Sequence, residues 1–175
     1  MIDGEKRKAD ILAALQQAEK PISATSFAKK FGVSRQIVVG DVALLRASGE
    51  RIIATARGYL LERESEKLIS KLAVQHTPEQ TAEELHTIIE HGGEVIDVVV
   101  EHPLYGELVG GLHLVTAQDV DTFVKEAEHL NVTLLSELTA GIHLHTIAYE
   151  SLADLTKIKQ ALSEKGILYE EKHHS

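Results

Sequence analysis

The pattern of apolar positions along the first third of the chain predicts three helices. Residues 5–18, 24–31 and 35–47 each carry apolar side chains at helical spacing, and Pro21 ends the first of them. Gly32 suits the left-handed conformation that closes a helix, and Ser34 is a good N-cap for the next one. A helix, a short turn containing glycine and a second capped helix together predict a helix-turn-helix.

The spacing of apolar residues changes from 3.6 to 2 after the third helix. Residues 51–55 and 59–62 alternate as strands do, and the turn 56–58 joins them. A hairpin directly after the third helix predicts a wing, with Arg57 at its tip facing phosphate or the minor groove. The first 63 residues are therefore expected to form a winged helix-turn-helix domain.

Residues near the start of the third helix are suited to double-stranded DNA. The N-terminal residues of this helix meet base edges in the major groove, where arginine matches guanine and glutamine matches adenine. Arg35 and Gln36 occupy these positions. Ser34 and Arg46 are expected to contact the DNA backbone.

The distribution of charge supports this assignment, although the net charge of the chain is −9. Residues 1–63 hold 11 basic and 7 acidic side chains, a balance of +4, whereas residues 64–175 hold 7 and 20, a balance of −13. Only the first region suits a polyanion. The acidic second region is expected to stay away from DNA.

Periodicity beyond residue 63 predicts alternating strands and helices. Helices are expected after Thr77, Thr116 and Ser151, each a capping residue. The expected strands are 67–75, for which a helix is an alternative, 94–102, 107–115, 142–149 and a short edge strand at 167–170. This order predicts an α+β sandwich over residues 64–175, with an antiparallel or mixed sheet covered by helices.

The chain contains ten histidines and no cysteine, so a metal site would have to use His, Asp and Glu. His143 and His145 lie two apart on a predicted strand, which points both side chains to one face. His76 and Glu84 lie at the entrance to a predicted helix and in its second turn. Three imidazoles and a carboxylate suit Zn, Ni, Co, Fe or Mn.

No apolar stretch approaches the ~20 residues that a membrane span requires, and the N-terminus lacks the apolar segment of a secretory signal. We therefore expect a cytoplasmic protein without a membrane partner.

The first region resembles the winged helix-turn-helix domains of bacterial regulators. The resemblance rests on FGVSRQIVVGDVALLRASGERIIATARGYLLE and covers roughly the first 62 residues. Gly40 departs from the pattern, because related sequences usually place a larger polar residue there. A glycine inside a helix costs about 1 kcal/mol relative to alanine.

The second region resembles the three-histidine domain of niacin-responsive repressors of Gram-positive bacteria. The phrases HTPEQTAEELHTIIEHGGEVIDVVVEHPLYGEL and LTAGIHLHTI carry this resemblance. It implies a homodimer that represses genes of niacin uptake and NAD-precursor use from a palindromic operator. Nicotinic acid would be the corepressor, with nicotinamide replacing it in some members.

The resemblance also implies roles for particular residues. The divalent metal site of the family maps onto His76, Glu84, His143 and His145. The histidine of the EHP phrase maps onto His102, in a supporting or effector-binding role. If the nitrogen of nicotinate binds the metal, its carboxylate needs donors, which we expect near Thr139 and Gly141.

Three other functions fit the residues. A winged-helix regulator could sense the metal itself. A non-haem metalloenzyme could use two histidines and a carboxylate, and a metal-bound water could make it a hydrolase. Glu101 and Glu107 are present, but no general acid or base stands at a telling spacing. A constitutive DNA-binding protein could use the second region only for dimerisation. Of these classes we expect a repressor and not an enzyme.

Overall fold

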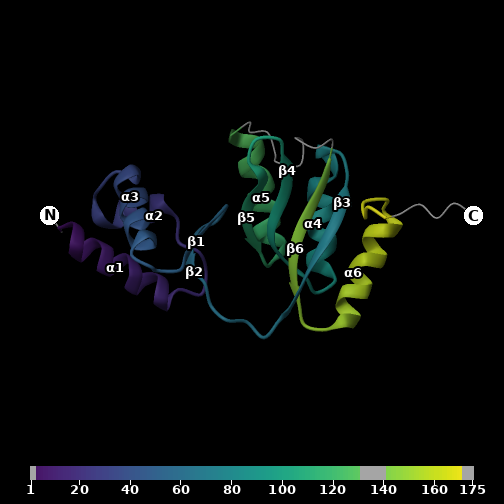
Figure 1. Ribbon diagram of the computed structural model, residues 1–175, viewed down its shortest axis with the longest axis horizontal. Coiled ribbons are helices and arrows are strands. Elements are labelled where there is room, and N and C mark those ends of the chain that lie inside the picture. The colour runs from purple at the N-terminus through teal and green to yellow at the C-terminus, as the bar shows by residue number, and fades with distance from the viewer. Residues whose placement is uncertain (1–2, 131–140, 171–175) are drawn as a thin grey trace, which may run out of the picture. The chain divides into compact units, whose positions relative to one another are not determined.

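A computed structural model describes residues 3–130 and 141–170 (Figure 1). The chain forms two compact units, Met1–Ser65 and Glu66–Ser175. Within the described ranges, no helix is both long enough and apolar enough to cross a membrane.

The first unit opens with the three helices that the sequence predicts. Gly32 takes the left-handed conformation, with φ 66°, and its amide donates to the carbonyl of Ala28. The hydroxyl of Ser34 accepts from the amide of Ile37 at 3.2 Å and so caps the third helix. The helices are α1 (Gly4–Gln17), α2 (Ala24–Phe31) and α3 (Arg35–Ala47).

The wing is a two-stranded antiparallel hairpin of β1 (Ile52–Thr55) and β2 (Gly58–Leu61). Ile22 joins it through two backbone hydrogen bonds with Tyr59, of 2.9 and 2.8 Å. These bonds fasten the loop before α2 to the wing. The core beneath is apolar and comprises Ile11, Leu15, Ala24, Phe27, Ala28, Val38, Val42 and Ile52.

One ion pair in this unit was not expected from the sequence. Asp41 lies on the inner side of α3 with 5% of its surface exposed, and Arg7 of α1 donates to it from Nη2 at 3.0 Å. The pair ties the third helix to the first. The signal in the sequence was an aspartate on the otherwise apolar stripe of Val38, Val42 and Leu45.

The second unit is built on a four-stranded sheet in the order β3-β6-β4-β5, and every neighbouring pair is antiparallel. The predicted α+β class is confirmed, and the sheet is antiparallel rather than mixed. The bounds of β4 and β6 match the prediction. The strands are β3 (Leu68–Gln75), β4 (Glu94–His102), β5 (Gly106–Leu114) and β6 (Ile142–Tyr149).

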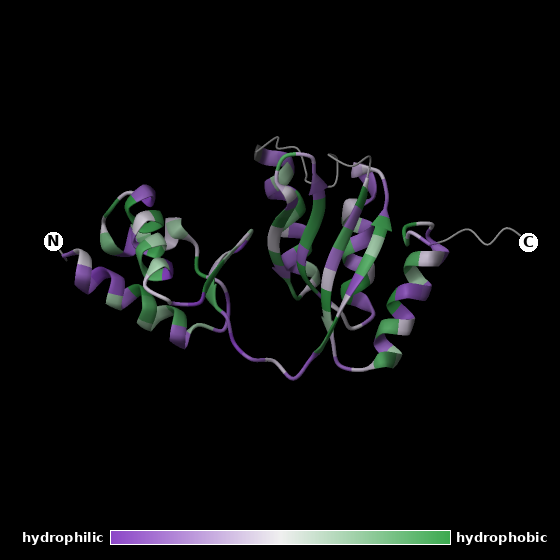
Figure 2. Cartoon of the chain, viewed as in Figure 1, coloured by the Kyte–Doolittle hydropathy of each residue, from purple (hydrophilic) through white to green (hydrophobic). Residues whose placement is uncertain are grey.

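Three helices pack against the sheet, namely α4 (Thr81–Glu90), α5 (Ala117–Leu130) and α6 (Leu152–Glu164). In Figure 2, hydrophobic stretches along the strands alternate with hydrophilic ones, as expected for a sheet with one face in the core. The core between sheet and helices contains Leu72, Val74, Leu85, Ile88, Val95, Leu112, Leu114, Val120, Ile147, Tyr149, Ile158, Leu162 and Ile167.

Two details differ from the prediction. The helix expected after Thr77 begins as a short 3₁₀ turn, η1 (Pro78–Gln80), within a Thr77–Gln80 capping box. The expected edge strand at 167–170 is reduced to a single bridge between Leu168 and Val74. The buried side chain of Ile167 anchors this segment, so it stays in place with little pairing.

Candidate functional site

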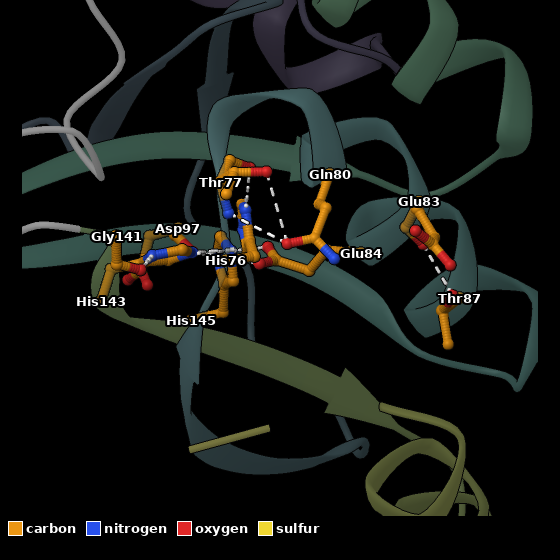
Figure 3. A network of polar contacts seen from close by, with 10 residues as sticks. All are labelled: His76, Thr77, Gln80, Glu83, Glu84, Thr87, Asp97, Gly141, His143 and His145. Carbon is orange, nitrogen blue, oxygen red and sulfur yellow. Dashed lines mark hydrogen bonds and ion pairs between the residues drawn. The ribbon is translucent and has the colours of Figure 1, made fainter. Parts of the chain in front are cut away.

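Four side chains from three elements converge in the second unit (Figure 3). His76 follows β3, Glu84 lies in α4, and His143 and His145 lie on β6. Their exposed fractions are 8%, 1%, 3% and 3%, respectively. Such burial of polar groups is costly unless they are paired or bind an ion.

The sheet register explains how these residues meet. His143 pairs with Val74 and His145 with Leu72, and both partners belong to the apolar core. The two histidines therefore point into the core, toward the side of the sheet that α4 covers. Glu84 is buried on α4 beside Leu85, so it enters the same layer.

Backbone carbonyl groups fix the orientation of all three imidazoles. The Nδ1–H of His76 donates to Thr77 at 2.7 Å, that of His143 to Gly141 at 2.9 Å, and that of His145 to Asp97 at 2.7 Å. A carbonyl oxygen only accepts, so each Nδ1 carries a proton. In the neutral rings, Nε2 is then left as a bare lone pair.

These Nε2 atoms face one another and the carboxylate of Glu84. The Nε2 atoms of His143 and His145 are 3.1 Å apart, and that of His143 is 3.2 Å from a Glu84 oxygen. The Glu84 carboxylate also contacts Nε2 of His76 and of His145. Possible ligand atoms of His76, Glu84 and His143 all lie within 4.8 Å of one another.

Charges within the cluster are strongly coupled. Burial opposes ionisation of Glu84, but the three imidazoles together hold the pKa of its carboxyl well below its usual value. Burial likewise opposes protonation of His76 and His145, yet contact with Glu84 raises the pKa of both imidazoles. The cluster therefore favours a carboxylate with positive charge beside it.

A divalent cation fits this arrangement better than hydrogen bonds alone. Nε2 of His76 and Oε2 of Glu84 are buried against each other in a close contact that does not form a regular hydrogen bond. Lone pairs that face each other across 3.1 Å have no proton to share in the neutral rings. Transition-metal sites commonly bind one nitrogen of an imidazole directly, while the other nitrogen donates a hydrogen bond to a backbone carbonyl that orients the ring.

Gly141 helps to position two histidines of the cluster. Its backbone is left-handed, with φ 87°, and a Cβ on it would overlap the carbonyl oxygen of His76. The missing side chain lets the end of β3 approach the start of β6. Its carbonyl also orients His143, so Gly141 positions two members of the cluster.

Asp97 is a residue that the sequence analysis missed. It follows a bulge in β4, its carbonyl orients His145, and its carboxylate accepts from the amide of Thr146 at 3.0 Å. A bulge depends on the register of neighbouring strands, which no local pattern in the sequence reveals.

The predicted effector residues are placed only in part. His102 ends β4, and the register Val98↔His145 puts it on the same face of the sheet as the cluster. Its Nδ1 accepts from the amides of Leu104 and Tyr105, so it also shapes the β4–β5 turn. Gly141 adjoins the cluster, and Thr139 lies outside the described residues.

The predicted DNA-binding residues lie at the surface of the first unit. Arg35, Gln36 and Arg46 are exposed on α3, and Ser34 caps its start. Arg57 lies in the turn of the wing, where its amide donates to Thr55. The structure thus separates this set from the buried apolar side of the same helix.

Comparison with known proteins identifies both units. Residues 7–60 match the model of an HTH domain family, and residues 69–171 match that of the 3H domain. The chain is 37% identical over 167 residues to the "Probable transcription repressor NiaR" of Thermotoga maritima, covering 95% of each chain. It is 38% identical over 172 residues to the "Transcription repressor NadR" of Bacillus subtilis, covering 94% of each.

The chain belongs to the NiaR/NadR family of transcription repressors.

Membership in the NiaR/NadR family confirms the resemblance inferred from the sequence. The chain is a DNA-binding repressor rather than a metalloenzyme, because its relatives are named as repressors and it carries their HTH domain. The 3H domain match includes His76, Glu84, His143 and His145.

Proposed function

We propose that this protein represses genes of niacin uptake and NAD-precursor use, with nicotinic acid as its corepressor. In this proposal a homodimer binds a palindromic operator in the cytoplasm through residues 1–63. Residues 64–175 bind the effector and a divalent metal. The names of the relatives and the motifs of the second unit support this function.

The observation that carries the sensor part is the buried convergence of three Nε2 atoms on Glu84. His76, Glu84, His143 and His145 would hold the ion, which is Zn, Ni, Co, Fe or Mn by ligand type. When bound, the ion would supply a Lewis acid able to accept the ring nitrogen of a pyridine carboxylate. The buried side chains around the ion would orient the effector and exclude water from the site.

Effector residues are proposed at one end of the sheet. His102 shares the face of His143 and His145, and Gly141 immediately precedes β6 beside the cluster. Together with Thr139 they are our candidates for binding nicotinate. A ligand placed here would touch β4, β6 and the residues that hold the metal.

On the DNA side, we propose that Arg35 and Gln36 contact base edges, that Ser34 and Arg46 contact the backbone, and that Arg57 contacts phosphate or the minor groove. The exposure of Ser34, Arg35, Gln36 and Arg46 supports this assignment, and Arg57 lies half-buried in the turn of the wing. The effector would act by favouring a dimer whose two third helices match the spacing of half-sites, one DNA turn or a multiple of it.

Calorimetric titration of nicotinic acid into metal-loaded and chelator-treated protein tests the sensor, with nicotinamide as the comparison ligand. We expect saturable binding that prefers nicotinic acid and is lost after metal removal. His143→Ala should abolish it, whereas His86→Ala, which changes a half-buried histidine paired with Asp121 outside the cluster, should not. Binding that survives metal removal would make the metal structural.

Operator binding separates this function from the alternative of a metal-responsive regulator. A nicotinic acid sensor requires the effector for tight binding when the metal is already present. If metal alone changes operator affinity and nicotinic acid adds nothing, the protein senses the metal. A constitutive repressor would bind equally in all conditions.

A further inference from the structure

Gly40 lies in the middle of α3, on the surface of the first unit. Among the described residues it is the one glycine inside a helix and away from its end. Its backbone is not left-handed, and a Cβ built on it meets no atom within 4 Å. The fold of the chain therefore gives no reason for a glycine here.

A glycine in this position weakens the helix, because it adds backbone freedom to the unfolded chain and leaves the helix without a side chain. Alanine would fit the same backbone and space. The chain thus retains a residue that is unfavourable for its own stability. A glycine does, however, allow a partner molecule to approach the backbone of α3 closely.

Helical periodicity shows where Gly40 points. Val38, Asp41 and Val42 define the buried side of α3. Gly40 lies on the opposite side, one turn after Gln36 and three residues before Ala43. This side of the third helix faces the major groove in helix-turn-helix proteins.

Apolar side chains flank Gly40 on both sides. Ile37 and Val39 on its flanks expose 43% and 38% of their surface. None of these residues offers a side-chain hydrogen bond to a base edge. The apolar group that a base presents in the major groove is the C5-methyl of thymine.

We propose that Gly40 is a specificity-determining residue whose Cα receives the methyl group of a thymine in each half-site. A Cβ at this position would hold α3 away from the base pair, and Gln36 would then lose its reach. The inference rests on the proposed docking of α3 in the major groove. It adds a base preference that a contact list of polar side chains would miss.

The experiment uses the full-length protein and a duplex that the unaltered protein selects from a randomised pool. Each thymine of that duplex is replaced in turn by uracil, which removes only the methyl group. We expect one position per half-site to lose about fourfold in affinity, which is the factor expected for one buried methyl group.

Gly40→Ala provides the complementary change. This variant should bind the selected duplex at least about tenfold more weakly, as for a mismatched base pair. Uracil at the sensitive position makes room for the new methyl group and should restore part of the loss. Gly40→Val should lose more than Gly40→Ala and should not be restored.

Stability measurements exclude a folding defect. Gly40→Ala should unfold at a higher temperature than the unaltered protein, by roughly 4–8 °C. Ala13→Gly, on an exposed face of α1, should lower the unfolding temperature without changing the affinity for DNA. Opposite signs of stability and affinity in Gly40→Ala would support the inference.

Two results would overturn it. If Gly40→Ala binds the selected duplex as tightly as the unaltered protein, Gly40 makes no close contact. If no uracil substitution changes affinity, the group beside Gly40 is not a thymine methyl. Should the unaltered protein enrich no duplex at all, the proposed operator binding fails together with this inference.

Discussion

The two units differ in where their candidate functional side chains lie, at the surface in the first unit and in the interior in the second. In the first unit the proposed DNA-binding residues are exposed, except for the half-buried Arg57, and the core is apolar apart from Asp41. In the second unit His76, Glu84, His143 and His145 lie inside, next to Leu72 and Val74. Function and stability should therefore separate in the first unit and be coupled in the second.

The largest expected effect comes from removing the proposed metal ion. Without the metal, the free energy of unfolding of the second unit should be about 4 kcal/mol lower than in the presence of metal at 1,000 times its dissociation constant. The unfolding temperature of the first unit should not change, since the apolar side chains of its core cluster cannot bind a metal. Calorimetric scans of loaded and chelator-treated protein would measure both transitions.

Glu84→Gln should erase this metal-dependent difference, whereas Glu83→Gln on the exposed side of α4 should preserve it. Equal metal-dependent stabilisation of both variants would show that Glu84 is not a ligand.

Arg7→Met addresses the exception in the first unit. It leaves the buried carboxylate of Asp41 without its cation and should lower the unfolding free energy of this unit clearly more than the control variant does. Chemical denaturation would report the loss. Lys8→Met, which removes only an exposed pair with Glu5, is the matched control and should change stability by less than about 0.5 kcal/mol.

Gly141→Ala sharpens the comparison in the second unit. The added methyl group overlaps His76 and should displace it from Glu84. We expect metal affinity to fall about 10- to 100-fold, as for other residues that orient ligands. Gly166→Ala has a similar left-handed backbone, with φ 73°, but open space around it. If both variants lose metal affinity equally, the overlap is not the cause.

The smallest expected effect on stability belongs to Arg35→Ala. It should weaken operator binding by about 1–3 kcal/mol and leave the unfolding free energy within about 0.5 kcal/mol. Binding to the selected duplex and to an unrelated duplex would be compared. A uniform loss on both would assign Arg35 to the phosphate backbone rather than to a base.

Much of this architecture could be predicted because it follows local periodicity. The caps at Ser34 and Thr77 and the strand carrying His143 and His145 are short-range patterns. The Arg7–Asp41 pair and the bulge before Asp97 are not, because each depends on elements far apart in the sequence. The sequence analysis assigned Gly141 to the effector, whereas its packing also supports His76.

The three backbone carbonyl groups that orient the imidazoles are insensitive to most amino-acid substitutions. Every amino acid carries the same carbonyl, so no codon change at Thr77, Asp97 or Gly141 deletes the acceptor itself. A deep mutational scan would find the ligands but would see this support only where a substitution bends the backbone. The hydrogen bonds that orient the three imidazoles therefore depend on the path of the backbone and not on the identity of a side chain.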